Sequence, residues 1–123
     1  MAPTVNRPST RVDYSQLLDA AVSNTPNNDA FGTNGKLYFL FVSNKTAGNT
    51  ANFLKLYDTK EQVTEGTTLP THIFPIAQNA NEAFHFPEGI NFANAIAYTA
   101  SQTGGTAAGT APGAVMTIQM VFK

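Results

Sequence analysis

The chain has 123 residues, a net charge of −1 and no Cys or Trp, and only 12% of its residues are charged, against about 25% in an average soluble domain. Its hydrophobic fraction of 42% excludes the composition of a disordered chain, and its seven Lys and Arg residues are too scattered to form a nucleic-acid-binding patch. The absence of Cys excludes disulfides and Cys-ligated metal centres. The length allows one domain, and we expect neither a signal peptide nor a membrane span, because no apolar stretch is long enough.

Residues 1–34 are predicted to form an extended N-terminal arm followed by one short helix. The segment Met1–Thr10 is polar, contains two prolines and shows no sustained period, which is typical of an arm. The pattern predicts a helix over Asp13–Val22, with Asp13 as N-cap and Gln16 three residues later as in a capping box. The apolar residues of this segment recur at helical spacing: Tyr14, Leu17, Leu18, Ala21 and Val22.

From Gly35 the pattern changes to strands, so residues 35–123 are predicted to form one β-sandwich domain. The expected strands are Lys36–Ser43, Ala51–Tyr57, Thr71–Ile76, Ala83–Phe86, Ala95–Thr99 and Ala114–Phe122, of which the last shows the clearest alternation. Pro75 indicates an edge strand or a bulge, because proline cannot donate a ladder hydrogen bond. Short strands, turn residues and at most one short helix predict an all-β, antiparallel sandwich of the jelly-roll or immunoglobulin-like type.

The strand Lys36–Ser43 is too apolar for a strand with one exposed face. It is either buried on both faces or lies partly at a contact between subunits. We interpret the aromatic residues at strand spacing as core, because large aromatic side chains dominate core burial. The alternative is a stacking platform for sugars, which the absence of Trp makes weaker.

The chain carries none of the common catalytic signatures, such as G-x-S-x-G, the P-loop, G-x-G-x-x-G or H-E-x-x-H. Glu82, His85 and Glu88 could supply two carboxylates and an imidazole to a metal. Because no diagnostic spacing supports that site, we favour a solvated polar rim, and we interpret His72 as a surface or interface histidine. A formal glycosylation sequon at Asn44 is expected to be inert, because no secretion signal precedes it. We therefore expect no catalytic residue, cofactor or bound metal.

The acidic residues after the second expected strand form the nominal carboxylate pairs of a glycoside hydrolase, Asp58 with Glu61 and Glu61 with Glu65. Both pairs lie close to Lys60 in the sequence. This mixture of charges indicates an exposed polar loop, so we expect the protein not to be an enzyme. A small hydrolase would need a histidine within hydrogen-bond reach of a serine and a carboxylate.

Two runs in the strand region resemble small structural proteins of tailed bacteriophages. The first is Phe53–Asp58 (FLKLYD), followed by Gly66-Thr67, Pro70 and Pro75. The second is Phe86–Ala100 (FPEGINFANAIAYTA). The resemblance extends from Lys36 to Phe122, and Ala95 departs from the pattern, in which Gly is expected.

The resemblance implies a capsid decoration, or cement, protein. Such a protein is made in the host cytoplasm, binds the outer shell of the virion and stabilises contacts between major capsid proteins. The resemblance also implies a homotrimer and no catalytic residues, and we expect no contact with nucleic acid or membrane.

The N-terminal arm lies outside the resemblance. We expect Met1–Arg11 to lie on a neighbouring subunit or on the shell, because arms and edge strands can add to a neighbour's sheet. The candidate contact residues are Val5, Arg7, Arg11 and Tyr14, of which the two arginines would make ionic contacts with shell carboxylates.

Two other functions stay open. One is a small tail, neck or fibre-associated virion protein. The other is a carbohydrate-binding β-sandwich that contacts host glycans through exposed aromatic residues beside the polar loops Asn44–Thr50 or Ser101–Gly113. The low charge favours an assembly protein, because a neutral polar surface packs against partners with little charge to desolvate.

Overall fold

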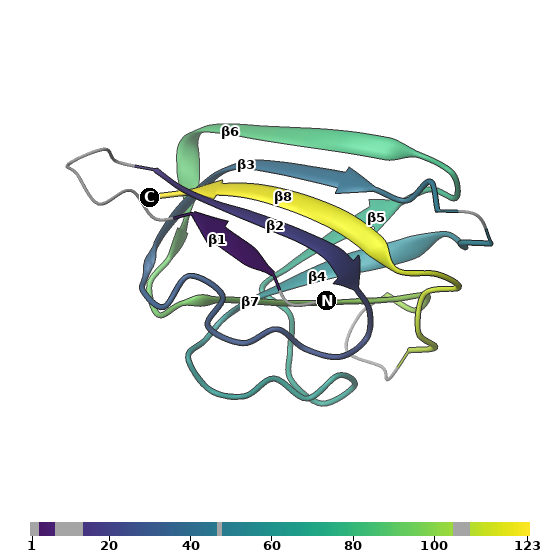
Figure 1. Cartoon of the computed structure of the whole chain (residues 1–123). Helices are drawn as coiled ribbons and strands as arrows, with labels where there is room; N and C mark the ends of the chain where they lie inside the picture. The colour runs from purple at the N-terminus through teal and green to yellow at the C-terminus, as the bar shows by residue number, and fades with distance from the viewer. Residues whose placement is uncertain (1–2, 7–13, 47, 105–108) are drawn as a thin grey trace.

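The computed structural model of the chain describes residues 3–6, 14–46, 48–104 and 109–123, and within them the chain forms eight β-strands and no helix (Figure 1). The strands are β1 (Thr4–Asn6), β2 (Ser15–Val22), β3 (Gly35–Ser43), β4 (Asn52–Asp58), β5 (His72–Ile76), β6 (Asn81–Phe92), β7 (Ile96–Ser101) and β8 (Met116–Phe122). The all-β prediction is confirmed, and each expected strand overlaps one of the strands from β3 to β8.

The strands form two antiparallel sheets that pack face to face (Figure 1). The larger sheet has the order β1-β2-β8-β3-β6 and the smaller one β5-β4-β7. Residues 23–30 extend the smaller sheet, because Asn27 and Tyr98 of β7 exchange two backbone hydrogen bonds of 3.0 Å. With this segment counted, the sandwich has the connectivity of a jelly roll, to which β1 adds one edge strand.

The helix expected over Asp13–Val22 is wrong, because the segment forms strand β2 from Ser15 onward. Leu17 is 2% exposed and Leu18 is 43% exposed, so consecutive side chains point to opposite faces, as in a strand. Hydrogen-bonded ladders to β1 and β8 outweigh an apolar spacing that also suits a helix. The expected N-cap residue lies outside the described residues. The described part of residues 1–34 thus contributes two strands to the five-stranded sheet.

The core lies between the sheets and receives inward side chains from both. Its largest aromatic members are Phe31, Phe92, Tyr98 and Phe122. Phe31 stacks on Phe122 with ring centroids 4.4 Å apart, and Phe92 lies 6.4 Å from the same ring. The prediction that aromatic residues at strand spacing fill the core is confirmed for Phe92, Tyr98 and Phe122. Phe39 and Phe41 instead face away from the core at alternate positions of β3.

A buried carboxylate joins the two sheets at one side of the sandwich. Asp19 is 1% exposed and lies at a bulge in β2. It accepts hydrogen bonds from the Tyr98 hydroxyl (2.7 Å), from Nδ2 of Asn27 (3.3 Å) and from the backbone N–H of Ala21 (2.9 Å). Burial, together with the hydrogen bond and charge of Asp19, raises the pKa of Tyr98, which therefore stays protonated as a donor.

The connection between β4 and β5, residues 59–71, lies over the outer face of the three-stranded sheet, and we call it the covering loop (Figure 1). Val63 of this loop is buried against Tyr57 and Ala97. Its backbone N–H donates to Oδ1 of Asn28 at 2.8 Å. The loop therefore packs on the sheet as part of the folded structure.

A buried ion pair holds the covering loop in place. Nζ of Lys55 lies 2.8 Å from Oε1 of Glu65, and the two side chains are 1% and 10% exposed. The hydroxyls of Thr99 and Tyr57 donate to Oε2 of Glu65 at 3.0 and 3.3 Å. Burial alone would raise the pKa of Glu65, but hydrogen bonds from Lys55 and Thr99 and the charge of Lys55 hold this pKa below its ordinary value. The prediction of an exposed loop is therefore wrong for Glu65.

Removing one partner of this pair should destabilise the fold more than removing both. Glu65→Leu leaves the Lys55 ammonium buried without its carboxylate, which should lower the unfolding free energy by about 3–5 kcal/mol. The double variant Lys55→Met, Glu65→Leu should recover most of this loss, because apolar side chains replace the desolvated charges. Urea unfolding of wild type, both single variants and the double variant measures the difference. Additive losses in the double variant would contradict the prediction.

The pH dependence of the same variants provides an independent control. The pKa of Glu65 is lower in the folded protein than in the unfolded chain. The ion pair therefore contributes its full stabilisation above the unfolded pKa of glutamate, about 4.3, and loses it as the pH falls through the lower folded pKa. The double variant should lose less stability than wild type over this acidic range.

Candidate interaction surface

The strand register places nine side chains in two adjoining rows on the outer face of the five-stranded sheet. One row contains Thr4, Leu18, Gln119, Phe41 and Ala83, and the next contains Gln16, Val121, Phe39 and His85. At alternate positions of the same strands, Leu17, Leu40 and Met120 are buried in the core. We call the nine outward residues the five-strand face.

The five-strand face carries no Asp, Glu, Lys or Arg among its nine residues. The ring of Phe39 lies 4.9 Å from the ring of His85. At the end of the sheet where β2 begins, Tyr14 is 44% exposed and meets Tyr38 edge-on at 5.7 Å. Nζ of Lys123 lies 5.4 Å from the centre of the Tyr14 ring, so this end of the sheet carries a charge. The nine residues themselves lack charge and include Phe39 and Phe41, which is the composition of the central part of protein–protein interfaces.

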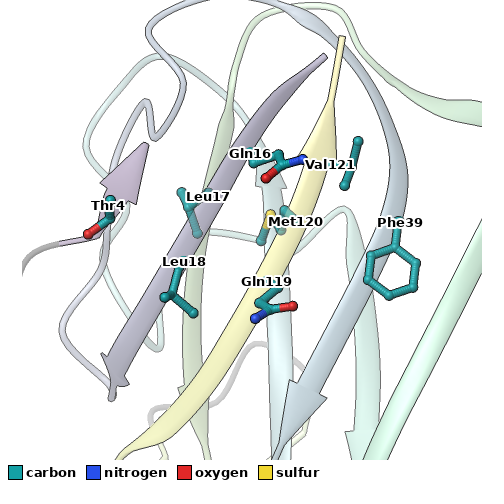
Figure 2. Close-up of a pocket in the computed structure, with 8 residues that line it drawn as sticks. All are labelled: Thr4, Gln16, Leu17, Leu18, Phe39, Gln119, Met120 and Val121. Carbon is teal, nitrogen blue, oxygen red and sulfur yellow. The ribbon is translucent and has the colours of Figure 1, made fainter. Parts of the chain in front are cut away.

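A hollow of about 330 Å³ lies on the five-strand face (Figure 2). It is lined by Thr4, Gln16, Leu17, Leu18, Phe39, Gln119, Met120 and Val121. Figure 2 shows the ring of Phe39 on one side of Gln119 and the side chain of Leu18 on the other. Because the lining carries no charged side chain, the hollow suits an uncharged group.

The two outer faces of the sandwich differ in what lies over them. The covering loop lies on the three-stranded sheet and buries Lys55 and Tyr57 beneath it. On the five-stranded sheet, Leu18 at 43% exposure shows that the corresponding face is open to solvent. The five-strand face is therefore an open sheet face that can meet a partner, whereas the covering loop shields Lys55 and Tyr57 of the other sheet and leaves Ile73 of β5 38% exposed.

The strands at the sheet edges carry features that hinder pairing with another chain. β7 is flanked by residues 23–30, and β1 is only three residues long. Pro75 lies in β5, and β6 contains Pro87 together with Glu82 and Glu88. Prolines, charges and short length are the usual protection against strand addition. Association through strand edges is therefore less favourable here than association through a sheet face.

Glu82, His85 and Glu88 do not form the metal site that their sequence allows. Glu82 is paired with Val42, so its side chain lies on the core side of the sheet. His85 is paired with Phe39, so its side chain lies on the outer side. Among the residues that the structure describes, no three His, Asp or Glu side chains come close enough to hold a metal ion.

The other candidate residues have structural surroundings. His72 is half-buried and its ring packs against the core residue Phe92 at 5.7 Å. Whether it lies at an interface with a partner stays a prediction. The carboxylate of Asp58 accepts two backbone N–H groups of the β6–β7 turn at 3.1 and 2.8 Å. Asn44 is fully buried and donates from Nδ2 to two backbone carbonyls, so the sequon is inaccessible.

The predicted contact residues of the arm lie in different settings. Val5 is in β1, opposite Leu17, and packs against the core. Tyr14 is exposed, whereas Arg7 and Arg11 lie outside the described residues. Their contacts with a partner stay a prediction.

Sequence reasoning did not assemble the five-strand face, because its residues come from five strands that are distant along the chain. One signal was present: the alternation in the last expected strand places Gln119 and Val121 opposite Met120 and Phe122. The register of β8 with its neighbours adds the remaining members.

Models of known protein families, curated proteins and solved structures give no match to this chain. Its relation to tailed-bacteriophage proteins therefore stays a prediction. In the described part of the chain, no helix has the length and apolar character to cross a membrane.

Two neighbouring leucines test which side of β2 is buried. Leu17→Ala should lower the unfolding free energy by about 2–5 kcal/mol, because it leaves a cavity in the core. Leu18→Gln should change it by less than about 0.5 kcal/mol, because this side chain faces solvent. Urea unfolding compares the variants, and equal losses would contradict the strand orientation.

Proposed function

We propose that the chain is a capsid decoration protein that binds the outer shell of a tailed-bacteriophage virion and stabilises contacts between major capsid proteins. One observation carries the proposal: the nine residues of the five-strand face are uncharged, include Phe39 and Phe41 and are open to solvent, while the covering loop buries Lys55 and Tyr57 on the other sheet. Such a face is stabilised by contact with another protein, because apolar area leaves water and no charged side chain has to be desolvated.

The fold supports this proposal without deciding it. Jelly rolls occur in viral capsid proteins and in lectins, and one fold serves many functions. A decoration protein acts through buried contact area and needs a rigid body that presents a fixed surface. The jelly-roll sandwich, closed by the Asp19 and Lys55–Glu65 contacts, provides such a body.

We assign the shell contact to the N-terminal arm, with Arg7 and Arg11 as the ionic contacts and Val5 and Tyr14 beside them. β1 ties the beginning of this arm to the sheet through its pairing with β2. On this proposal the protein lies on the capsid surface in many copies, and the resemblance favours a homotrimer.

Two other functions remain proposals of lower rank. A tail, neck or fibre-associated protein would use the same kind of surface, but it would be present in few copies at one place on the particle. A glycan-binding protein would use the hollow, where Phe39 lies with the side-chain amides of Gln16 and Gln119.

The two arginines of the arm provide a test of the shell contact. The variant Arg7→Ala, Arg11→Ala should bind particles that lack this chain severalfold more weakly than wild type, because exposed ion pairs contribute about 0.2–1 kcal/mol each. Raising the salt concentration should weaken wild-type binding and narrow the difference. Cosedimentation of purified protein with such particles, followed by imaging, measures occupancy and position.

The control is Lys45→Ala, Lys60→Ala, which removes the same amount of charge at two exposed positions that are distant from the arm in the sequence. It should bind like wild type. Equal occupancy of the arginine variant and wild type would contradict the arm contact. Failure of the wild-type protein to bind particles would contradict the decoration function itself.

A further inference from the structure

We infer that the five-strand face binds a second copy of this chain, face to face around a two-fold axis. The inference goes beyond the decoration function, whose shell contact is assigned to the N-terminal arm, and it concerns only what covers the five-strand face. It rests on the absence of charged residues from the face, on the area of the sheet and on the position of β8 within the sheet.

The absence of charge on the five-strand face limits the kind of surface that can bind there. A charged surface would lose hydration against the nine uncharged side chains of the face without gaining an ion pair. The opposite side of the sandwich carries Lys60 and Glu61 at exposed positions, and the β6 edge carries Glu82 and Glu88. The five-strand face of a second copy matches in lacking charge, so the two faces can cover each other without leaving a charge unpaired.

The area is sufficient for a specific contact. Strands lie about 4.8 Å apart and rise about 3.3 Å per residue. With five strands, one of them short, and seven residues in β8, the whole outer side of the five-stranded sheet, of which the five-strand face is a part, covers roughly 500 Å². Two copies would bury roughly 1,000 Å², which is the lower limit of a specific interface. We therefore expect a dimer of modest affinity that is populated at high protein concentration.

The sheet order determines which residues meet. β8 is the central strand of the five, so a two-fold axis through the middle of the face brings Gln119 of one copy close to Gln119 of the other. The two sheets would stack about 10 Å apart, as in a β-sandwich. The hollow beside Gln119 would receive uncharged side chains of the second copy.

A two-fold contact closes with two copies, whereas the trimer implied by the resemblance needs two different patches on each copy. The two assemblies differ in mass, so one measurement separates them.

Charge at Gln119 tests the contact. Sedimentation equilibrium of wild type should show a monomer–dimer equilibrium. Gln119→Glu and Gln119→Lys should each weaken dimerisation by about tenfold or more, because like charges then meet near the axis. An equimolar mixture of the two variants should associate again, because opposite charges meet in the mixed dimer. Near-UV circular dichroism checks that each variant is folded.

Gln62 provides the matched control, because it is an exposed glutamine on the covering loop. Gln62→Glu and Gln62→Lys should leave dimerisation unchanged. The inference would be overturned if wild type stayed monomeric up to about 1 mM. It would also be overturned if charged substitutions at Gln62 weakened the dimer as much as those at Gln119. A trimer that is insensitive to charge at Gln119 would also overturn it.

A monomer that binds neutral saccharides on a glycan array, and loses them on Phe39→Ala, would assign the face to glycans instead. If dimerisation fails while wild type still binds particles, the decoration function stands and only the self-contact is overturned. If the dimer forms but does not bind particles, the self-contact stands and the decoration function is overturned.

Discussion

The buried ion pair between Lys55 and Glu65 determines which side of the sandwich can meet a partner. It fixes the covering loop over β4 and β7 of the three-stranded sheet, so the outward side chains of Lys55 and Tyr57 become part of the protein's own interior. On the five-stranded sheet, Leu18 of the five-strand face and Tyr14 at the end of the sheet are exposed to solvent. Together with strand edges that hinder pairing, this asymmetry leaves one broad surface for association.

The structure shows where the scarcity of charged residues has its main effect, which is on the five-strand face. Charged residues are few, and the nine positions of the five-strand face hold none of them. Desolvated charges lie instead inside the molecule, where Lys55 and Glu65 are paired and hydrogen-bonded. A surface without ionic groups can be buried against an equally neutral partner, and high local concentration favours that contact.

The alternation of core-facing and outward side chains within a strand can be predicted from the sequence, whereas the contacts between strands cannot. The last strand was predicted because Met116, Ile118, Met120 and Phe122 alternate with polar or solvent-facing residues. The apolar spacing of β2 fits a helix as well as a strand, and only its ladders with β1 and β8 decide between the two.

Glu65 seemed exposed because its partner Lys55 lies ten residues earlier on another element. The five-strand face likewise depends on a register among five strands that are distant in the sequence. Such tertiary pairings carry no local signal, so the candidate surface could not be predicted beyond the apolar character of Lys36–Ser43.

The most direct test is the reactivity of a single thiol on the five-strand face, because the natural chain contains no cysteine. A variant with Gln119→Cys should be alkylated progressively more slowly as protein concentration rises, since association buries the thiol. A variant with Gln62→Cys should react at the same rate throughout. A thiol at position 119 that stays as reactive as the one at position 62 at every concentration would contradict the central claim.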